Sequence, residues 1–251
     1  MQYLAIAAVG LAAGAINAAA GSGSLLTFPV LLGLGYSPLV ANVSNSVGLT
    51  FGNLSASFGY RRELEGQRSR LLRLAPFSLV GGAVGAVLLL ALPHQVFRVV
   101  VPGLVILAVV LLLLQPRLAK VRSSREANGG DSGPVGRGPG LPAAVLGTAV
   151  YGGYFGAAQG VILIAALGVF LDDTLQRLNG LKNILTSMAN GAAAVVFIFR
   201  APVAWDAALV LAGASIVGGQ LGAGVGRRLP PTVLRWVVIV GGAAAAIKLL
   251  V

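Results

Sequence analysis

The sequence has no cysteine, one histidine and few charged residues, and each shortage excludes some kinds of function. Without cysteine there is no disulfide framework, no thiolate metal site and no thiol nucleophile. The single histidine, His94, cannot form a histidine metal cluster, and a Ser-His-Asp triad is nearly excluded. Only 10% of the 251 residues are charged, whereas a soluble domain carries about 25%. We therefore expect neither an enzyme nor a protein with a bound metal or cofactor.

Apolar residues are abundant instead, at 57% of the chain. A transmembrane helix needs about 20 consecutive apolar residues. The runs that come close to that length or exceed it are 3–34, 40–59, 74–92, 96–115, 142–171, 177–199, 204–226 and 231–250. The first and fifth runs hold about 30 residues each, which is too long for one upright span. The sequence therefore predicts an all-α polytopic membrane protein in which each of these two runs is a broken helix or a re-entrant hairpin.

The net charge of +11 does not indicate nucleic-acid binding, because the basic residues fall in short loops rather than on one folded face. Basic loops mark the cytoplasmic side of a membrane protein. By this rule the loop 61–73 and the segment 116–141 are cytoplasmic. The later residues Arg177 and Arg227 are also cytoplasmic if 142–171 is a hairpin, but not if it crosses once. We therefore favour a hairpin, with eight plain spans as the alternative.

The chain divides into two similar halves. Gly81-Gly-Ala-Val-Gly85 matches Gly218-Gly-Gln-Leu-Gly222 at an offset of 137 positions, and 19–23 matches 157–161 at nearly the same offset. With about four apolar segments in each half, we expect a first transmembrane repeat over 1–115, a flexible basic cytoplasmic linker over 116–141 and a second transmembrane repeat over 142–251. A hairpin at the start of each half gives it an odd number of crossings. The two repeats would then be inverted, as in many secondary transporters.

Polar side chains inside apolar runs are costly in a bilayer unless they bond to partners or line a cavity. Here they cluster at matching places in the two halves, and asparagines share a helix face in each. Hydrogen bonding between packed helices is the simpler interpretation for any single Asn, and snorkelling to the surface is the alternative for Lys182. Taking the clusters together, we predict a substrate site formed by Asn17, Gly21, Ser22, Gly23, Ser24, Asn42, Asn45, Gln159, Gly160, Asn179, Lys182 and Asn183.

The residue types in this predicted site favour an anion. The run Gly21-Ser-Gly-Ser24 can break a helix, and the helix that follows then offers free amides and a positive dipole end. Gln159-Gly160 is the matching break in the second half. Lys182 adds a cation, and no acid lies deep in an apolar run, where a cation carrier normally places one. The plausible proton relays are Asp172 and Asp173, at the end of a run.

The stretch 13–49 resembles the opening signature of the sulfite exporter TauE/SafE family of membrane permeases. The matching residues are Gly14, Asn17, Gly21, Gly23, Ser24, Pro29, Pro38, Asn42 and Asn45. The runs 153–160 and 178–183 resemble the second repeat of that family. The resemblance implies transport of sulfite, sulfonates or other small sulfur-containing anions, usually outward, across the bacterial inner membrane. The first break reads Gly-Ser-Gly-Ser here, where Gly-Gly-Gly-Ser is common in the family.

We therefore expect a multi-pass permease of the bacterial inner (plasma) membrane that exports small sulfur-containing anions such as sulfite or organosulfonates. A negative cell interior favours anion efflux without a coupling ion. The expected partners are the small anionic substrate and the lipid bilayer, with no nucleic acid and with a homodimer as one option for the oligomeric state. Proton-coupled uptake of the same anions through Asp172 or Asp173 is the alternative, and a non-transport membrane scaffold is a further one.

Overall fold

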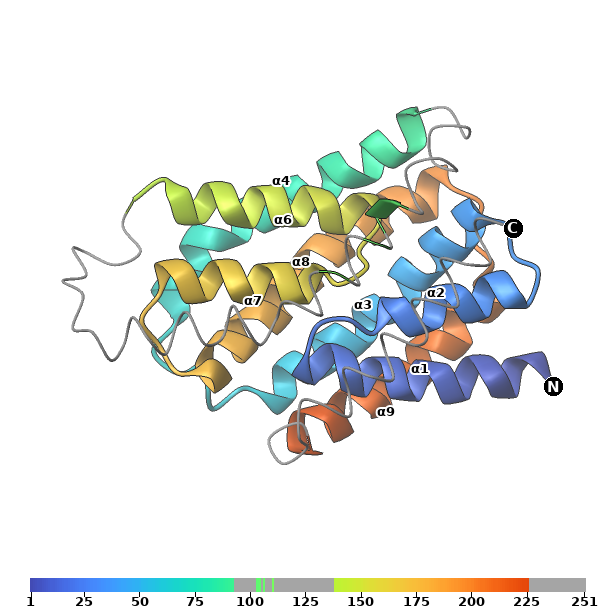
Figure 1. Ribbon diagram of the computed structural model, residues 1–251, viewed down its shortest axis with the longest axis horizontal. Coiled ribbons are helices and arrows are strands. Elements are labelled where there is room, and N and C mark those ends of the chain that lie inside the picture. Colours follow the sequence, from blue (N-terminus) through green and yellow to red (C-terminus); the bar gives the residue numbers. More distant parts are fainter. Residues whose placement is uncertain (93–102, 105, 107–109, 111–137, 226–251) are drawn as a thin grey trace.

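The computed structural model describes residues 1–92, 103, 104, 106, 110 and 138–225, and every regular element among them is a helix. The helices are α1 (Gln2–Ala19), α2 (Ser24–Gly33), α3 (Pro38–Gly59), α4 (Arg68–Ala91), α6 (Gly140–Tyr154), α7 (Gln159–Phe170), α8 (Leu175–Arg200) and α9 (Trp205–Val225), as Figure 1 shows. Helices long and apolar enough to cross a membrane are Gln2–Ala19, Arg68–Ala91, Leu175–Arg200 and Trp205–Gly224. The predicted all-α polytopic class is confirmed for this part of the chain. The predicted runs 96–115 and 231–250, and most of 116–141, lie outside the described residues.

Both long apolar runs are broken, as the sequence predicts. The first is divided at residues 20–23 into α1 and α2, and the second at residues 155–158 into α6 and α7. The second break therefore lies just before the predicted Gln159-Gly160, which are the first two residues of α7. Left-handed backbone makes the turns, with φ of 77° at Gly21, 75° at Gly156 and 57° at Ala158. Glycine adopts this conformation freely, whereas a residue with a Cβ meets a cost of about 1–2 kcal/mol. The break at Ala158 therefore depends on the contacts that surround it.

The chain turns back on itself at each break. The hydroxyls of Tyr3, near the start of α1, and of Tyr36, just after α2, both donate to Oδ2 of Asp206, at 3.0 and 3.3 Å. At the second break, a Cβ added to Gly140, which begins α6, would lie 2.8 Å from the ring of Phe170, which ends α7. Each pair of helices is therefore a hairpin whose two outer ends lie together.

The two hairpins extend in opposite directions from their breaks. In Figure 1, α1 and α2 extend to the right, whereas α6 and α7 extend to the left. The first hairpin ends beside Asp206, which follows α8, and the second ends three residues before Asp173, which precedes α8. The 26-residue helix α8 separates these two positions. The hairpins therefore enter the bundle from its two opposite ends.

Helix α4, from the first half of the chain, packs closely on helices of the second half. A Cβ added to Gly82 would lie 2.1 Å from the carbonyl oxygen of Ala189 in α8. One added to Gly85 would lie 2.1 Å from the carbonyl oxygen of Val150 in α6. Small residues are what allow helix backbones to approach this closely in a membrane.

Helix α9, from the second half of the chain, packs in the same way on helices of the first half. A Cβ added to Gly219 would lie 2.4 Å from the carbonyl oxygen of Gly52 in α3, and one added to Gly222 would lie 2.4 Å from that of Ala15 in α1. Gly82 and Gly219 hold the same position in the two matching motifs. The motif of each half therefore packs on the hairpin and the long polar helix of the other half.

We expect Gly82→Val to destabilise the protein, since the added carbons would meet rigid backbone rather than a flexible side chain. Overpacking of this kind costs about 1–3 kcal/mol in the free energy of unfolding. Thermal unfolding of the purified protein in detergent measures the loss. Gly224→Ala is the control, because a Cβ at this helical glycine has no atom of the described residues within 4 Å. An unfolding midpoint for Gly82→Val equal to that of the control would contradict the close packing of α4.

Candidate functional site

The two breaks pack against each other inside the protein. The amide of Gly160 donates to the carbonyl oxygen of Gly21 at 3.1 Å. A Cβ added to Gly21 would lie 2.4 Å from the Cα of Gly160, so no side chain fits between them. The rings of Phe28 in α2 and Phe155 in the second break also meet edge to face, with centroids 5.3 Å apart. The breaks therefore form one packed unit.

Side chains around the first break hold its shape. The amide of Gly23 donates to Oδ1 of Asn17 at 2.6 Å, across the turn. One turn into α2, the hydroxyl of Thr27 donates to Oδ1 of Asn45 in α3. Gly23 also lies so close to α1 that an added Cβ would be 2.2 Å from the carbonyl oxygen of Ala13. The glycines of this break are thus required by close backbone contacts as well as by the turn itself.

Lys182 of α8 lies at the carbonyl end of α1. Its side chain is 0% exposed, and Nζ donates to the carbonyl oxygens of Asn17 at 2.9 Å and Ala18 at 3.2 Å. Nδ2 of Asn183 donates to the same oxygen of Ala18 at 3.1 Å. The last carbonyls of a helix lack partners within the helix and carry a partial negative charge. Lys182 and Asn183 satisfy them from the other half of the chain.

Side chains also cap carbonyl oxygens at the second break, and one of these side chains comes from the other half of the chain. Nδ2 of Asn42, in α3, donates to the carbonyl oxygen of Tyr154 at the end of α6, at 3.0 Å. The hydroxyl of Tyr151 donates to the carbonyl oxygen of Ala157 within the break, at 2.6 Å. The long polar helix of each half therefore caps the broken helix of the other half.

Six buried side-chain oxygens at the breaks and on their capping helices have no hydrogen-bond partner among the described residues. They belong to Ser22, Asn42, Gln159, Gln176, Asn179 and Asn183. A buried polar atom without a partner costs about 1–3 kcal/mol, and nearly all such atoms in proteins are satisfied by protein, water or ligand. All of these residues except Gln176 belong to the predicted site. Their oxygens mark where a polar ligand or ordered water would bind.

These residues lie at different positions along the long axis of the helix bundle. A Cβ added to Gly180 of α8 would lie 3.5 Å from Tyr60, which follows the last residue of α3, and one added to Gly191 would lie 3.8 Å from Thr50 of α3, so the two helices run antiparallel. Asn183 therefore lies near the end of α3, whereas Asn42 lies near its start. Of the predicted site residues, the structure brings these to the first break or its contact with the second: Asn17, Gly21, Ser22, Gly23, Ser24, Gly160, Lys182 and Asn183.

The remaining predicted residues lie elsewhere. Asn42 and Asn45 bond to the second break and to α2, and Gln159 packs against Gly152 of α6. Asn179 is one turn from Asn183 on the same face of α8, and its side-chain oxygen has no hydrogen-bond partner among the described residues. The functional role of every one of these residues stays a prediction.

Three contacting residues are absent from the predicted set. They are Thr27, Tyr151 and Phe155, which bind or pack on the breaks. Thr27 and Tyr151 are polar side chains inside long apolar runs, which is a signal that sequence offers. Phe155 gives no such signal, because an aromatic side chain in an apolar run is ordinary.

Asp173 lies at the outer end of the second hairpin rather than at the breaks. Its carboxylate forms ion pairs with Arg70 of α4 at 2.5 Å and with Arg177 of α8 at 2.8 Å. Burial alone would raise the pKa of Asp173, but the hydrogen bonds from Arg70, Arg177 and the amide of Thr174 bring that pKa below its ordinary value. Asp172 beside it is exposed. This cluster connects the starts of α4 and α8.

We expect Asp173→Asn to lower the free energy of unfolding at neutral pH by about 0.5–1 kcal/mol, since Arg70 is partly exposed and solvent screens its pairing. A carboxylate whose folded pKa is lowered stabilises the protein above its ordinary pKa, and that stabilisation is lost as the pH falls through the folded pKa. The difference from the wild type should therefore vanish in acid. Glu65→Gln, which changes an exposed carboxylate, is the control for denaturation measured across pH. A difference that persists in acid would count against the ion pairs.

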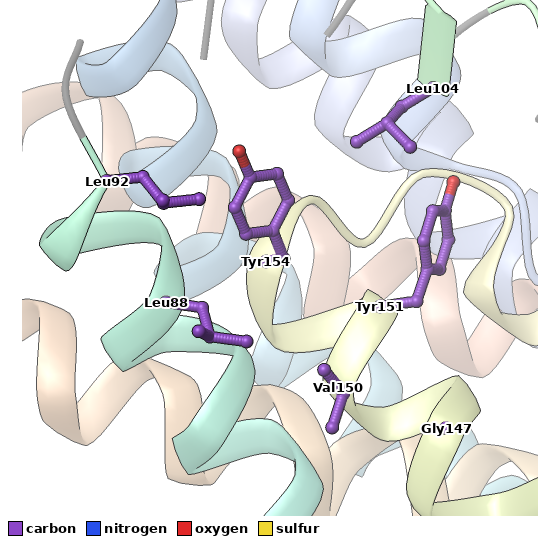
Figure 2. Close-up of a pocket in the computed structure, with 7 residues that line it drawn as sticks. All are labelled: Leu88, Leu92, Leu104, Gly147, Val150, Tyr151 and Tyr154. Atoms are coloured by element: carbon purple, nitrogen blue, oxygen red, sulfur yellow. The ribbon is translucent and has the colours of Figure 1, made fainter. Parts of the chain in front are cut away.

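An apolar hollow of about 380 Å³ lies beside the second break (Figure 2). Its lining residues are Leu88, Leu92, Leu104, Gly147, Val150, Tyr151 and Tyr154. The described lining residues are all uncharged, so they offer no counter-charge to a small ion. Lys182 and the unpartnered oxygens of the predicted site residues lie at the breaks and on their capping helices instead.

Broken helices that meet inside a polytopic bundle and are lined by buried polar groups are typical of membrane transporters. The model of the Sulfite exporter TauE/SafE family matches residues 6–249. The chain belongs to this family and is a membrane transporter, as its sequence resemblance predicts.

Curated relatives carry matching descriptions. The chain is 29% identical to the "Probable membrane transporter protein YfcA" of Escherichia coli (strain K12) over 250 residues, which cover 96% of this chain and 87% of the relative. It is 26% identical to a "Probable membrane transporter protein" of Haemophilus influenzae over 238 residues, with 92% and 88% covered. A "Probable membrane transporter protein ORF9" of Sinorhizobium sp is 24% identical over 252 residues, with 100% and 92% covered. No solved structure matches the chain.

Proposed function

We propose that the protein exports small sulfur-containing anions, such as sulfite or organosulfonates, across the bacterial inner membrane. One observation carries the choice of an anion. The ammonium of Lys182 is fully buried, and the partners it contacts are neutral backbone carbonyls. A buried charge without a counter-charge is costly. A small anion bound beside Lys182, where the two breaks meet, would supply that counter-charge.

The amide end of α2 supports the same proposal. The amide of Ser24 donates to no other described residue, and it lies at the positive end of the helix dipole. Such an end binds anions well when a second positive group is near. Efflux of one negative charge from a cell at −100 mV releases about 2.3 kcal/mol. Export therefore needs no coupling ion.

The ion pairs of Asp173 favour export over proton-coupled uptake. A proton relay has to take up and release a proton at working pH. The pairs with Arg70 and Arg177 lower the pKa of Asp173 and so keep its carboxylate ionised. This carboxylate is also remote from the breaks. A coupling proton would have to use Asp172 or another route.

Flux in proteoliposomes under a set membrane potential tests the proposal. We expect efflux of sulfite and ethanesulfonate to follow the voltage and to ignore a pH gradient, with little movement of potassium ions. Flux driven by the pH gradient at zero voltage would favour proton coupling. Absence of any anion flux above that of protein-free liposomes would refute the proposed function.

We further propose that 1–115 and 142–251 are inverted repeats joined by a cytoplasmic linker. The reciprocal caps and the crossed glycine contacts support this proposal, because matched positions in the two halves make matched contacts. The chain lacks cysteine, so single cysteines report topology cleanly. Asp172→Cys and Pro202→Cys, both at exposed positions on opposite ends of α8, should label from opposite sides of the membrane, the first from the cytoplasm. Labelling of Asp172→Cys from the outside and of Pro202→Cys from the cytoplasm, as eight plain spans require, would overturn the inverted arrangement.

A further inference from the structure

Asn183 has an amide whose orientation is fixed by its partner. A carbonyl oxygen only accepts hydrogen bonds, so the group that faces the carbonyl oxygen of Ala18 must be the NH₂ of Asn183. Its Oδ1 then faces the other way, and it is buried without a partner. As long as Nδ2 of Asn183 donates to the carbonyl oxygen of Ala18, Oδ1 of Asn183 remains a free acceptor.

Asn179 places a second unpartnered oxygen one helical turn away. Residues four apart lie on the same helix face, about 5–6 Å apart at Cβ. Oδ1 of Asn179 is buried and unpartnered too, and the residue is 5% exposed. The hydroxyl oxygen of Ser22, in the break that Asn183 caps, is a third. The face of α8 beside Lys182 thus offers acceptors as well as a cation.

An anion that carries only acceptors would fit such a face poorly. It would pair with the ammonium of Lys182, but it would leave Oδ1 of Asn183 unsatisfied and facing negative charge. Leaving a buried acceptor unpaired is costly, and a site built to bond a donor rejects ligands that lack it. A ligand with both a negative charge and an O–H or N–H group satisfies both features at once.

We propose that the transported anion carries at least one hydrogen-bond donor, and that Asn179 and Asn183 select for it. This inference rests on the proposed function, since it names the substrate class of the same site. A hydroxylated organic sulfonate and a protonated oxyanion such as hydrogensulfite share this chemistry. The selection acts at the first break, where the donor would bond to Oδ1 of Asn183.

The decisive comparison uses two sulfonates of equal charge and nearly equal size. In 2-hydroxyethanesulfonate an O–H group replaces the terminal methyl of propanesulfonate. We expect the wild-type protein in proteoliposomes to move the hydroxylated anion about tenfold faster at low substrate concentration, the effect of about 1.4 kcal/mol. A second experiment measures sulfite flux at fixed voltage and at two pH values. Hydrogensulfite is the main species at the lower pH, and the sulfite dianion is the main species at the higher pH. Preference in either experiment supports the inference and identifies the source of the donor.

Two variants test whether side chains of α8 select for the hydrogen-bond donor. Asn183→Ala removes the free acceptor, while Lys182 still donates to the carbonyl oxygen of Ala18, so the cap on α1 is retained. In this variant and in Asn179→Ala the preference should fall to about twofold or less. Ser187→Ala is the matched control one turn further along α8, because its hydroxyl bonds only to the helix carbonyl of Asn183. The control should keep the full preference.

Three outcomes would overturn the inference. Equal rates for the two sulfonates, without preference for hydrogensulfite, would mean that ordered waters satisfy the oxygens. An unchanged preference in both asparagine variants would place the selection elsewhere. Loss of preference in Ser187→Ala would mean that any disturbance of α8 has the same effect. Failure of every anion to move is a different result, because it refutes the proposed function itself.

Discussion

Gly21→Ala should abolish transport and destabilise the protein. The added Cβ would lie 2.4 Å from the Cα of Gly160, and Gly21 has a φ of 77° that favours glycine. The clash costs about 1–3 kcal/mol and the left-handed backbone about 1–2 kcal/mol more. Because the two breaks form one unit, separating them would also move the groups proposed to bind the anion. Anion flux should therefore fall by more than about tenfold.

Gly160→Ala separates the two causes. This substitution makes the same clash from the other side, but Gly160 does not have a positive φ. We expect it to lower flux as strongly while lowering the free energy of unfolding less than Gly21→Ala does. Gly213→Ala is the control, since a Cβ there has nothing within 4 Å. Flux of Gly21→Ala within a factor of about two of the wild type would mean that contact between the breaks is dispensable.

Lys182→Met should remove most transport while changing stability much less. The methionine side chain has a similar length and no charge, so the carbonyl oxygens of Asn17 and Ala18 lose their ammonium donor. Hydrogen bonds to charged groups contribute about 1.5–3 kcal/mol each. Removing a buried charge also removes its desolvation cost, and the two effects offset each other in the folding equilibrium. No such offset applies to the binding of an anion.

The readout for Lys182 is a pair of measurements. Anion flux should fall by more than about tenfold, and the unfolding midpoint in detergent should shift by only a few degrees. Arg200→Ala, which removes an exposed cation at the end of the same helix, should change neither. If flux and stability fell together, Lys182 would be a structural cap for α1 with no part in attracting the anion. If neither fell, the positive charge would be unnecessary.

The sequence predicts the breaks well, because their causes are local. A run of about 30 apolar residues is too long for one span, and Gly21 and Gly23 offer the turn. The Gly81–Gly85 and Gly218–Gly222 motifs show in the sequence only as matching positions of the two halves, and the structure adds that both pack closely on other helices. The partner of each motif was not predictable. Any helix with small residues would serve, and the choice depends on the whole arrangement.

The role of Lys182 is less accessible to sequence. Its position in an apolar run predicts a buried cation or a snorkelling one, and the structure places it in the interior. What it contacts are main-chain carbonyls, and these have no signature in the sequence. The same applies to Asn42 and Asn183, whose amides cap helices in the opposite half. Contacts made to backbone can be predicted only when the fold is known.

Helices α4 and α9 each pack on the opposite half of the chain, so the order of synthesis determines when these contacts can form. The glycine-rich faces of α1 and α3 are made early, but their partner α9 ends at Val225, about 200 residues after α1. At a synthesis rate of about 5–20 residues per second, roughly 10–40 s pass before that partner exists. During this time the faces of α1 and α3 that pack on α9 have no protein partner from that helix. These two helices therefore complete their packing only after the ribosome has synthesised the chain as far as Val225.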